Sequence, residues 1–308
     1  MPPPHHRGRF APSPTGPLHF GSLVAAVASF AEARAAGGSW LVRMEDLDRP
    51  RAVPGAARQI LETLTAFALE WDGEVLYQST RTDAYEEALS RLAELDLTYP
   101  CACSRSQVAA SGRLGAEGPI YPGTCRSGLH PGQRARALRL RTEGPQIRFR
   151  DRIQGPQTQV VAESVGDFVV RRADGIHAYH LAVVMDDAWQ GINQVVRGAD
   201  LLASTPRQIL LQRALRLPTP DYAHVPLALG PDGGKLSKSR ASAPVDPADP
   251  LPALHRAWAF LGQTPLEYAR SPRHFWSQAI PRWRIDRVPP RLSNALEPAA
   301  APPPGRAG

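Results

Sequence analysis

The sequence predicts an α/β protein: a parallel sheet interrupted by an inserted domain and followed by a short helical segment. The first observation is that strand-like and helix-like patterns alternate through the first hundred residues, which is typical of a parallel sheet with crossover helices. The second is a stretch at residues 101–133 that is rich in Gly, Ser and Pro and shows little periodicity. The third is the return of apolar strand-like runs after it, which places the rest of the sheet beyond the insert.

The first half of the predicted sheet alternates strands with helices. Apolar residues at helical spacing indicate the helices, and the pair Gly37-Gly38 gives the first helix a stop signal. Short apolar runs indicate the strands. In chain order, the expected elements are a strand end at residues 9–11, a helix over 17–36, a strand over 40–44, and helices over 54–71 and 83–95.

The second half of the chain returns to regular patterns. Residues 136–150 alternate between apolar and polar side chains, as short strands do. The last 21 residues contain six Pro and five Ala, a composition that predicts a disordered tail. In chain order, the expected elements are strands within 136–150 and at 168–170, 181–185 and 192–196, a helix over 205–215, a helical segment over 252–268 and the tail over 288–308.

Arginine dominates the positive charge of the chain. The sequence has 36 basic and 29 acidic residues, a formal charge of +7, which favours acidic partners such as nucleic acids or phosphorylated ligands. Only two of the basic residues are lysines, Lys235 and Lys238. So strong a bias suggests that these two were retained because a guanidinium cannot replace a compact ammonium on a flexible stem.

The sequence shows no sign of export or membrane insertion. Its first ten residues hold no apolar segment of the signal-peptide kind, and the longest apolar run, at residues 23–28, is too short to span a bilayer. Three cysteines, an odd number, argue against a disulfide framework. We therefore expect a cytoplasmic enzyme without a membrane partner.

Two segments carry residues suited to phosphate. The loop at residues 12–16 leads into a predicted helix that opens with His19 and Gly21, and a helix N-terminus offers free N–H groups and a favourable dipole to an anion. A histidine near a helix start is, however, more often structural. The second segment, residues 235–239, places two lysines after a glycine turn, where a mobile loop can neutralise a polyphosphate. A solvated surface loop is the alternative for that segment.

Together these two segments resemble the paired signatures of class I aminoacyl-tRNA synthetases. The first reads HFGS from His19 to Ser22, and the second reads KLSKS over residues 235–239. Ser22 is a departure, because many synthetases carry a second histidine there and Ser22 can donate only a hydroxyl. Order and spacing resemble the glutamyl branch of that class over residues 7–287, through RFAPSPTG at 9–16, VRMEDLD at 42–48 and VRGADL at 196–201.

The region after the second lysine is short for a charging synthetase of that branch. Seventy residues follow Lys238, and without the expected disordered tail 49 remain, fewer than a typical domain needs. The chain is therefore similar to the family of glutamyl-Q tRNA(Asp) synthetases. That resemblance implies ATP-dependent activation of L-glutamate and transfer of the glutamyl group to queuosine at the wobble position of tRNA(Asp), by a monomer whose active site takes the anticodon loop.

Two other functions stay open at this point. A glutamyl-tRNA synthetase that charges a tRNA 3′ end would fit if its anticodon module were on another chain. A catalytically silent tRNA-binding paralogue would also fit, although the intact residues His19, Glu45, Arg197 and Lys238 argue against it.

The resemblance also divides the chain into regions. It implies a Rossmann-like nucleotide-binding domain split by a zinc-bearing α+β insertion. The expected boundaries are 7–98 for the first half of the catalytic domain, 99–175 for the zinc-binding, acceptor-type insertion, 176–240 for the second half with the lysine loop, 241–287 for a short helical region of the stem-contact type and 288–308 for the tail.

Glutamate has two carboxylates and one ammonium, and the chain has residues suited to each. Arg9 and Arg197 can clamp carboxylates by bidentate pairing, and Glu45 can pair with the ammonium. From the residues alone, a buried ion pair of Glu45 with Arg197 or with other neighbours is an equal alternative. The resemblance implies an L-glutamate site made of Arg9, Phe10, Ala11, Pro12, Ser13, Glu45, Tyr179 and Arg197.

No protein nucleophile is required, because the substrate carboxylate attacks the α-phosphate and pyrophosphate leaves. The resemblance implies catalytic roles for His19, Lys235 and Lys238, and ATP contacts from His19, Gly21 and Lys238. Mg²⁺ is expected to accompany ATP, held mostly by phosphates and water.

The three cysteines, Cys101, Cys103 and Cys125, fall within 25 residues. Such clustering in a poorly hydrophobic insert suggests one structural Zn²⁺. General zinc chemistry favours His130 as the fourth ligand, whereas the resemblance points to Tyr121. An open catalytic zinc and three free thiols are the remaining alternatives.

Arginine is enriched after the cysteine cluster. Eight of the 27 residues from 126 to 152 are arginines, which predicts a surface for the tRNA backbone. A solvated face of an arginine-rich protein is the alternative. The eight are Arg126, Arg134, Arg136, Arg139, Arg141, Arg148, Arg150 and Arg152.

Overall fold

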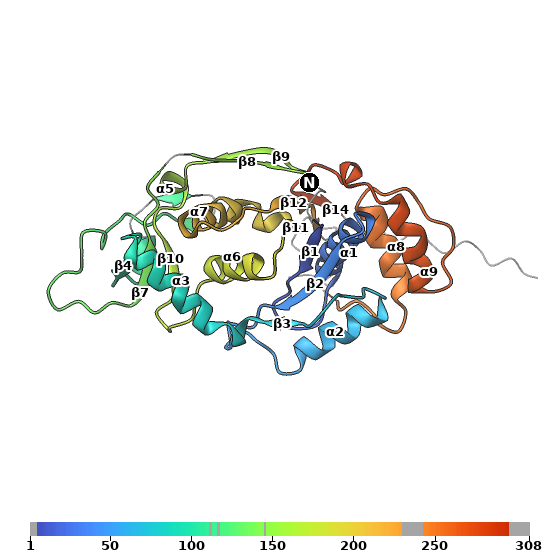
Figure 1. Cartoon of the computed structure of the whole chain (residues 1–308), viewed down its shortest axis with the longest axis horizontal. Coiled ribbons are helices and arrows are strands. Elements are labelled where there is room, and N and C mark those ends of the chain that lie inside the picture. Colours follow the sequence, from blue (N-terminus) through green and yellow to red (C-terminus); the bar gives the residue numbers. More distant parts are fainter. Residues whose placement is uncertain (1–4, 111–112, 116–117, 145, 230–242, 296–308) are drawn as a thin grey trace, which may run out of the picture.

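The parallel sheet predicted from the sequence lies at the centre of the molecule (Figure 1). The structure is a computed structural model that describes residues 5–110, 113–115, 118–144, 146–229 and 243–295. In its first half, strands β1 (Arg7–Phe10), β2 (Ser39–Met44) and β3 (Leu76–Tyr77) pair in parallel in that order. Helix α1 (Phe20–Ala35) makes the crossover from β1 to β2 that parallel pairing requires.

A second group of strands continues from β1. The parallel strands are β11 (Gln194–Gly198), β12 (Asp221–Val225) and β8 (Ile147–Asp151), and β9 (Gly155–Gln159) returns antiparallel to β8. The two groups meet where the backbone N–H of Asn193 donates to the carbonyl of Arg7, at 3.1 Å. Helix α7 (Thr205–Leu215), which forms as predicted, connects β11 to β12.

Side chains of β11 and β12 alternate between two hydrophobic cores, as strands covered on both faces require. Val196 and Ala223 belong to the core formed with α1, α2 (Ala56–Ala66), α8 (Pro250–Phe260) and α9 (Pro272–Arg282). Val195 and Tyr222 belong to the core formed with α3 (Thr82–Glu94), α6 (Tyr179–Trp189) and α7. Within the described part of the chain, no helix combines the length and apolar character needed to cross a membrane.

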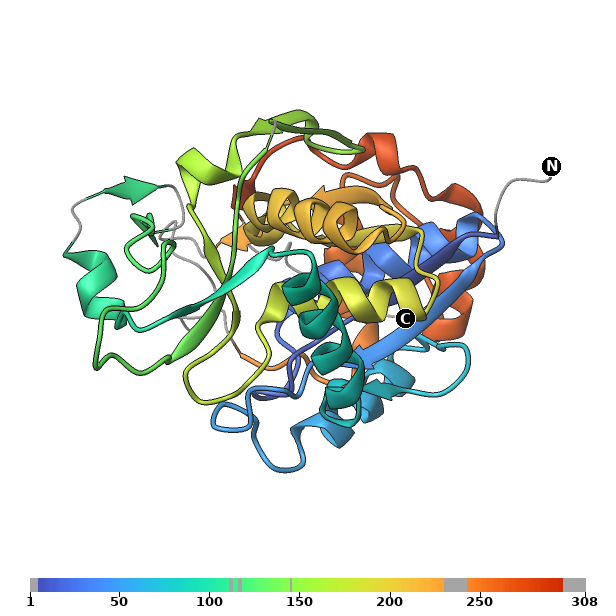
Figure 2. The ribbon, with the colours of Figure 1, turned by 60° about the vertical axis from the view of Figure 1, so that its left-hand side comes forward.

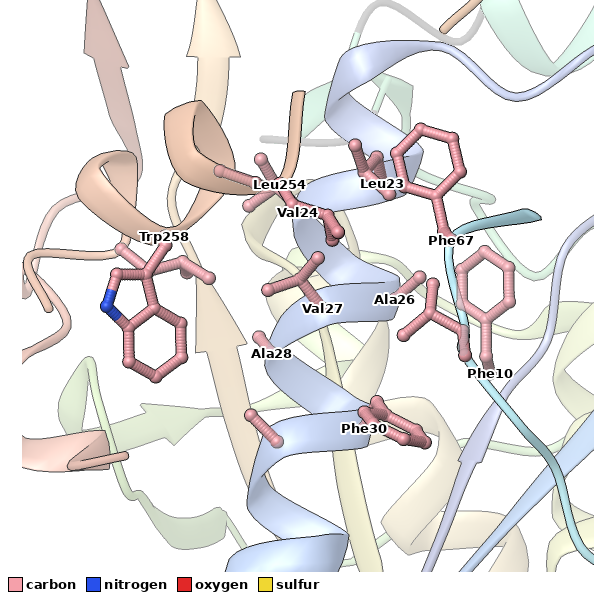
Figure 3. Packing of buried hydrophobic residues seen from close by; sticks show 14 of the residues in the cluster. Phe10, Leu23, Val24, Ala26, Val27, Ala28, Phe30, Phe67, Leu254 and Trp258 are labelled. Carbon is pink, nitrogen blue, oxygen red and sulfur yellow. The ribbon is translucent and has the colours of Figure 1, made fainter. Parts of the chain in front are cut away.

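Helix α1 is surrounded by apolar side chains along its middle. Figure 3 shows it between Leu254 and Trp258 on one side and Phe10 and Phe67 on the other. A helix that is apolar on all sides belongs in an interior, which explains why its residues 23–28 form an uninterrupted apolar run. Close packing on all sides fixes the direction of the helix, and with it the position of its N-terminus.

The strand predicted at residues 181–185 is wrong, because this run lies within helix α6. The helix packs between α3 and α7, so that consecutive residues are buried and no polar stripe marks the helical period. Asp186, which is fully buried, ties α6 to α3 and the turn before it. Its carboxylate accepts hydrogen bonds from Gln78 Nε2 at 2.9 Å and Tyr85 Oη at 2.6 Å, and pairs with Arg81 Nε at 3.2 Å.

The inserted residues form a lobe at one side of the sheet (Figure 2). Strands β4 (Thr98–Cys101), β7 (Ala137–Leu140) and β10 (Phe168–Arg171) make an antiparallel sheet in the order β10-β7-β4. Between β4 and β7 the described chain is mostly irregular, as the composition predicts. The short elements of the lobe are α4 (Arg105–Ala109), β5 (Leu114–Gly115), β6 (Gly118–Pro119) and α5 (Val161–Ser164).

The C-terminal region contains more structure than the sequence predicts. Helix α9 follows α8, beyond the single helical segment expected at residues 252–268. Residues 288–295, expected in a disordered tail, are ordered: Val288 is 2% exposed, and β14 (Ser293–Ala295) pairs in parallel with β13 (Leu227–Leu229). The proline-rich composition of the segment gave no sign of this order, which comes from one buried valine and a three-residue strand. Residues 296–308 lie outside the described part.

Substituting Asp186 by alanine is expected to destabilise the fold by about 3–5 kcal/mol, because it leaves two buried donors and a partly buried guanidinium without their acceptor. The free energy of unfolding in urea measures this. Glu87→Ala, at an exposed position of α3, is the matched control and should change it by less than about 0.5 kcal/mol. Equal effects of the two substitutions would contradict the assigned role of Asp186.

Candidate active site

A cavity of about 750 Å³ opens at the carboxyl ends of β1, β2, β11 and β12, beside the N-terminus of α1. Ligands bind at this edge in open α/β sheets, because the loops after the strands and the helix N-termini meet there. The cavity brings together the described residues that the sequence analysis assigned to glutamate and ATP: Arg9, Phe10, Ala11, Pro12, Ser13, His19, Gly21, Glu45, Tyr179 and Arg197. Lys235 and Lys238 lie outside the described residues.

His19 is the N-cap of α1, and Ser22 fixes its ring. The Nδ1 atom accepts the backbone N–H of Ser22 at 3.2 Å, which places the ring proton on Nε2, 3.1 Å from the Ser22 hydroxyl. Burial lowers the pKa of His19, although Asp200 partly opposes this, so the ring is neutral and Nε2–H is a donor. Ser22, expected from the sequence to donate only a hydroxyl where many synthetases carry a second histidine, therefore orients the first histidine.

Gly21 makes room for that ring. A Cβ at residue 21 would lie 3.2 Å from both Cε1 and Nδ1 of His19. A side chain there would displace the imidazole, so the glycine serves His19 as well as the cavity.

Beneath the cavity, one carboxylate is shared by two arginines. Asp187, on α6, lies 3.1 Å from Arg9 Nε and 2.8 Å from Arg43 Nη1. The second oxygen of Asp187 accepts from Arg9 Nη2 at 3.5 Å, so the forked edge of Arg9 faces Asp187. The bidentate clamp expected of Arg9 is therefore directed at the protein, and the arginine meets the cavity from a fixed position.

Glu45 follows β2 and borders the same network. Its Oε1 is 3.4 Å from Arg43 Nη2, so the ion pair that the sequence left open is made with Arg43 and not with Arg197. Burial raises the pKa of Glu45, although Arg43 and Arg9 oppose the rise. A cationic group in the cavity would favour its ionised form.

Arg197, at the end of β11, is 5% exposed and has no carboxylate partner among the described residues. Its Nε donates to His224 Nε2 at 3.0 Å, and its Nη2 donates to Thr205 Oγ1 at 2.9 Å. Its Nη1 is buried and has no hydrogen-bond partner in the described part of the chain. Because Arg197 also lines the cavity, this free nitrogen favours an anionic ligand over a structural ion pair.

Sequence reasoning gave no role to several residues of this site. Arg43 was visible as a charge inside an apolar strand, next to the recognised Glu45, and Asp187 as an acidic residue after an apolar run. His224 stands among apolar residues of β12. A polar residue in the middle of an apolar segment was the available signal.

The cysteine cluster lies in the inserted lobe. The sulfurs of Cys101, Cys103 and Cys125 are all within 4.8 Å of one another, a separation that one tetrahedral metal ion could span. Tyr121 Oη lies 3.4 Å from the sulfur of Cys101 and 3.9 Å from that of Cys103, and accepts the backbone N–H of Cys125 at 2.8 Å. Among the described residues, His130 does not belong to this cluster.

A guanidinium supports the cluster from one side. Arg139 Nε donates to the Cys101 sulfur at 3.2 Å, and its guanidinium lies 3.7 Å from the centre of the Tyr121 ring. Arg139 is thus one of three arginines of the enriched segment that serve the lobe itself, because Arg126 pairs with Asp167 and Arg141 donates to the carbonyl of Arg126. The exposed members are Arg134, Arg136, Arg148, Arg150 and Arg152.

Comparison with solved structures agrees with the fold. A glutamate tRNA ligase from Elizabethkingia meningosepticum superposes with a TM-score of 0.76 at 24% identity, covering 95% of this chain and 67% of that one. The glutamate-tRNA synthetase from Elizabethkingia anophelis gives a TM-score of 0.77, also at 24% identity, over 95% of this chain and 68% of that one. At this identity the likeness concerns the fold alone.

Comparison of sequences is more specific. The family model for the catalytic domain of class I tRNA synthetases (E and Q) matches residues 6–250. A glutamyl-Q tRNA(Asp) synthetase from Dechloromonas aromatica is 57% identical over 298 residues, 96% of this chain and 99% of the relative. Those from Chromobacterium violaceum and Geobacter sulfurreducens are 50% and 51% identical, over 92% and 96% of this chain and 95% of each relative. The chain therefore belongs to the class I tRNA synthetases, in the family of glutamyl-Q tRNA(Asp) synthetases.

Proposed function

We propose that this chain activates L-glutamate with ATP and transfers the glutamyl group to queuosine at the wobble position of tRNA(Asp). The observation that carries the proposal is one cavity lined both by the N-terminus of α1 and by Arg197, a buried guanidinium without a carboxylate partner in the described part of the chain. The names of relatives at 50–57% identity support the same substrates.

The charges around the cavity suit glutamate. Arg197 Nη1 is the donor for one carboxylate, and Glu45 is the acceptor for the α-ammonium. Tyr179 and Ser13 line the space between these ends and offer hydroxyl groups. A substrate without the second negative charge would leave a buried guanidinium unpaired, which is the basis for rejecting uncharged amino acids.

The other end of the cavity suits the nucleotide. The N-terminus of α1 presents backbone N–H groups, and the His19 ring, held by Ser22, lines the same end of the cavity. A glutamate carboxylate oxygen attacks the α-phosphorus of ATP, an acyl phosphate anhydride forms, and the bond to pyrophosphate breaks. In the transfer step, a queuosine hydroxyl takes the glutamyl carbonyl and AMP leaves. Lys235 and Lys238 are assigned to the phosphates, with Mg²⁺ accompanying ATP.

Of the five exposed arginines defined above, Arg152 pairs with Glu32 at 2.6 Å, and the other four give the inserted lobe and the β8–β9 hairpin a basic surface. We assign this surface to the tRNA backbone, where each phosphate contact adds to affinity and to its dependence on salt. Arg148 and Arg150, which alternate with inward residues on β8, extend the surface away from the cysteine lobe.

The decisive experiment offers radiolabelled glutamate and ATP with four RNAs: tRNA(Asp) and tRNA(Glu), each with and without queuosine. Label is expected only on tRNA(Asp) that carries queuosine, and glutamate alone should support ATP–pyrophosphate exchange. Label at the 3′ end of tRNA(Glu) would instead identify a charging synthetase. Absence of exchange under all conditions would identify a silent tRNA-binding paralogue.

The affinity for glutamate is expected to fall as the pH is lowered. The loss should begin at a higher pH than the protonation of an ordinary glutamate side chain, whose pKa is 4.5. The reason is that burial raises the pKa of Glu45, and the protonated carboxyl cannot pair with the ammonium. The KM for glutamate in pyrophosphate exchange measures this, with the KM for ATP as the internal control. Glu45→Gln should raise the KM for glutamate and remove this pH dependence; an unchanged profile in that variant would contradict the role of Glu45.

The insert is assigned one structural zinc ion, bound by Cys101, Cys103, Cys125 and Tyr121. The sulfur separations fit tetrahedral coordination, and the Tyr121 hydroxyl occupies the remaining side of the cluster. Arg139 offsets part of the negative charge of such a ligand set.

Metal analysis of the purified chain is expected to find one zinc ion, and Cys103→Ser should lose it. Tyr121→Phe should release zinc to a competing chelator more readily than the wild type, because one ligand is gone. His130→Ala is the matched control and should retain zinc like the wild type. Loss of zinc in the His130 variant together with full retention in the Tyr121 variant would reverse the assignment.

A further inference from the structure

We propose that His224 and Asp151 are positioning residues that hold Arg197 in the orientation in which it binds a substrate carboxylate. The inference rests on the proposed function, because it takes glutamate as the ligand of Arg197. Neither residue lines the cavity, and both are almost completely buried behind it, so they act through Arg197 and not on the substrate.

The hydrogen bonds of His224 require one tautomer. Its Nδ1 lies 2.5 Å from Asp151 Oδ2, a bond in which the ring must donate, and its Nε2 accepts from Arg197 Nε at 3.0 Å. Both bonds form only when the proton is on Nδ1 and Nε2 keeps its lone pair. Burial lowers the pKa of His224 to about 4, although Asp151 opposes this, so the ring is neutral.

Asp151 is itself held in one orientation. Its Oδ1 accepts the backbone N–H groups of Ile153 at 3.0 Å, Gln154 at 2.8 Å and His224 at 3.1 Å. These three donors leave Oδ2 facing the imidazole. The sequence of bonds from the β8–β9 turn through Asp151 and His224 to Arg197 therefore has a single arrangement of protons.

The result is a guanidinium with one free end. His224 takes the Nε–H, while Thr205 Oγ1 at 2.9 Å and the Leu201 carbonyl at 3.4 Å take the Nη2–H groups, so among the described residues only Nη1 is left without a partner. Arg197 thus presents one nitrogen in a fixed place and not its forked edge, which differs from the bidentate clamp expected from the sequence. A fixed donor loses little conformational entropy when the carboxylate binds.

The arrangement makes Asp151→Asn an unusually informative substitution. The new amide oxygen would keep the three backbone donors, so its NH₂ group would face Nδ1 of His224. An NH₂ donor forces the imidazole proton onto Nε2, where it opposes the Nε–H of Arg197. The carboxamide has nearly the same size as the carboxylate, so the change is one of proton placement more than of packing.

The test compares wild type, Asp151→Asn, His224→Gln and the double variant by ATP–pyrophosphate exchange. Asp151→Asn is expected to raise the KM for glutamate about tenfold or more, with the KM for ATP unchanged. In the His224→Gln background, Asp151→Asn should change the KM for glutamate little further. The reason is that glutamine has no Nδ1 and that its amide oxygen accepts from Arg197. Asp221→Asn, on the exposed end of β12, is the matched control and should leave both KM values unchanged.

If Asp151→Asn raised the KM for glutamate by the same factor in the wild-type and His224→Gln backgrounds, Asp151 would act only through the backbone. That result would overturn the inference. A ¹⁵N NMR spectrum of histidine-labelled wild type reads the tautomer directly and does not depend on the folding of any variant. Protonated Nδ1 on His224 is expected. Protonated Nε2 would overturn this inference but leave the proposed function intact. A wild type that does not activate glutamate at all would instead overturn the proposed function.

Discussion

The shared carboxylate of Asp187 is the interaction on which the site depends. Removing two guanidinium groups and a carboxylate from water costs several kcal/mol per ion, and good geometry only partly recovers that cost. Such a buried ion cluster adds little to stability, but it fixes the positions of its members, because a displaced partner would be left charged and buried. By binding Arg9 and Arg43 at 3.1 and 2.8 Å, Asp187 fixes β1 and β2 against α6 directly below the cavity.

Helix α1 links the core to the chemistry. Its middle is buried among aromatic and aliphatic residues that include Trp258 and Phe67, so the helix cannot tilt without opening the largest core of the molecule (Figure 3). The same rigidity fixes the N–H groups at its N-terminus and the His19 ring that Ser22 holds there. An anion site made of backbone needs this support, because its donors have no side-chain freedom with which to adjust.

Sequence patterns predicted the site better than they predicted its support. Site residues such as Glu45 and Arg197 followed from the family resemblance of the motifs that contain them, because from the residues alone a buried ion pair was an equal alternative. Their partners did not, since Asp187 and His224 come from segments far away in the chain and only tertiary packing brings them together. Helix α6 was mistaken for a strand for a related reason: burial on several sides removed the polar stripe that reveals a helix. The roles of Lys235 and Lys238 remain sequence predictions.

The two arginines that the sequence treated alike turn out to differ in kind. Arg9 has its charge balanced by Asp187 whether or not a ligand is present, so its contribution is mainly geometric. Among the described residues, Arg197 has only neutral acceptors, namely His224, Thr205 and the Leu201 carbonyl, and in the proposed function its charge is balanced when a carboxylate enters. The free energy that the fold gives up by burying this unpaired charge is recovered on binding of the correct substrate and not on binding of an uncharged one. In the proposed function, selectivity for an acidic side chain therefore follows from the fold, because β12 offers Arg197 a neutral histidine and not a carboxylate.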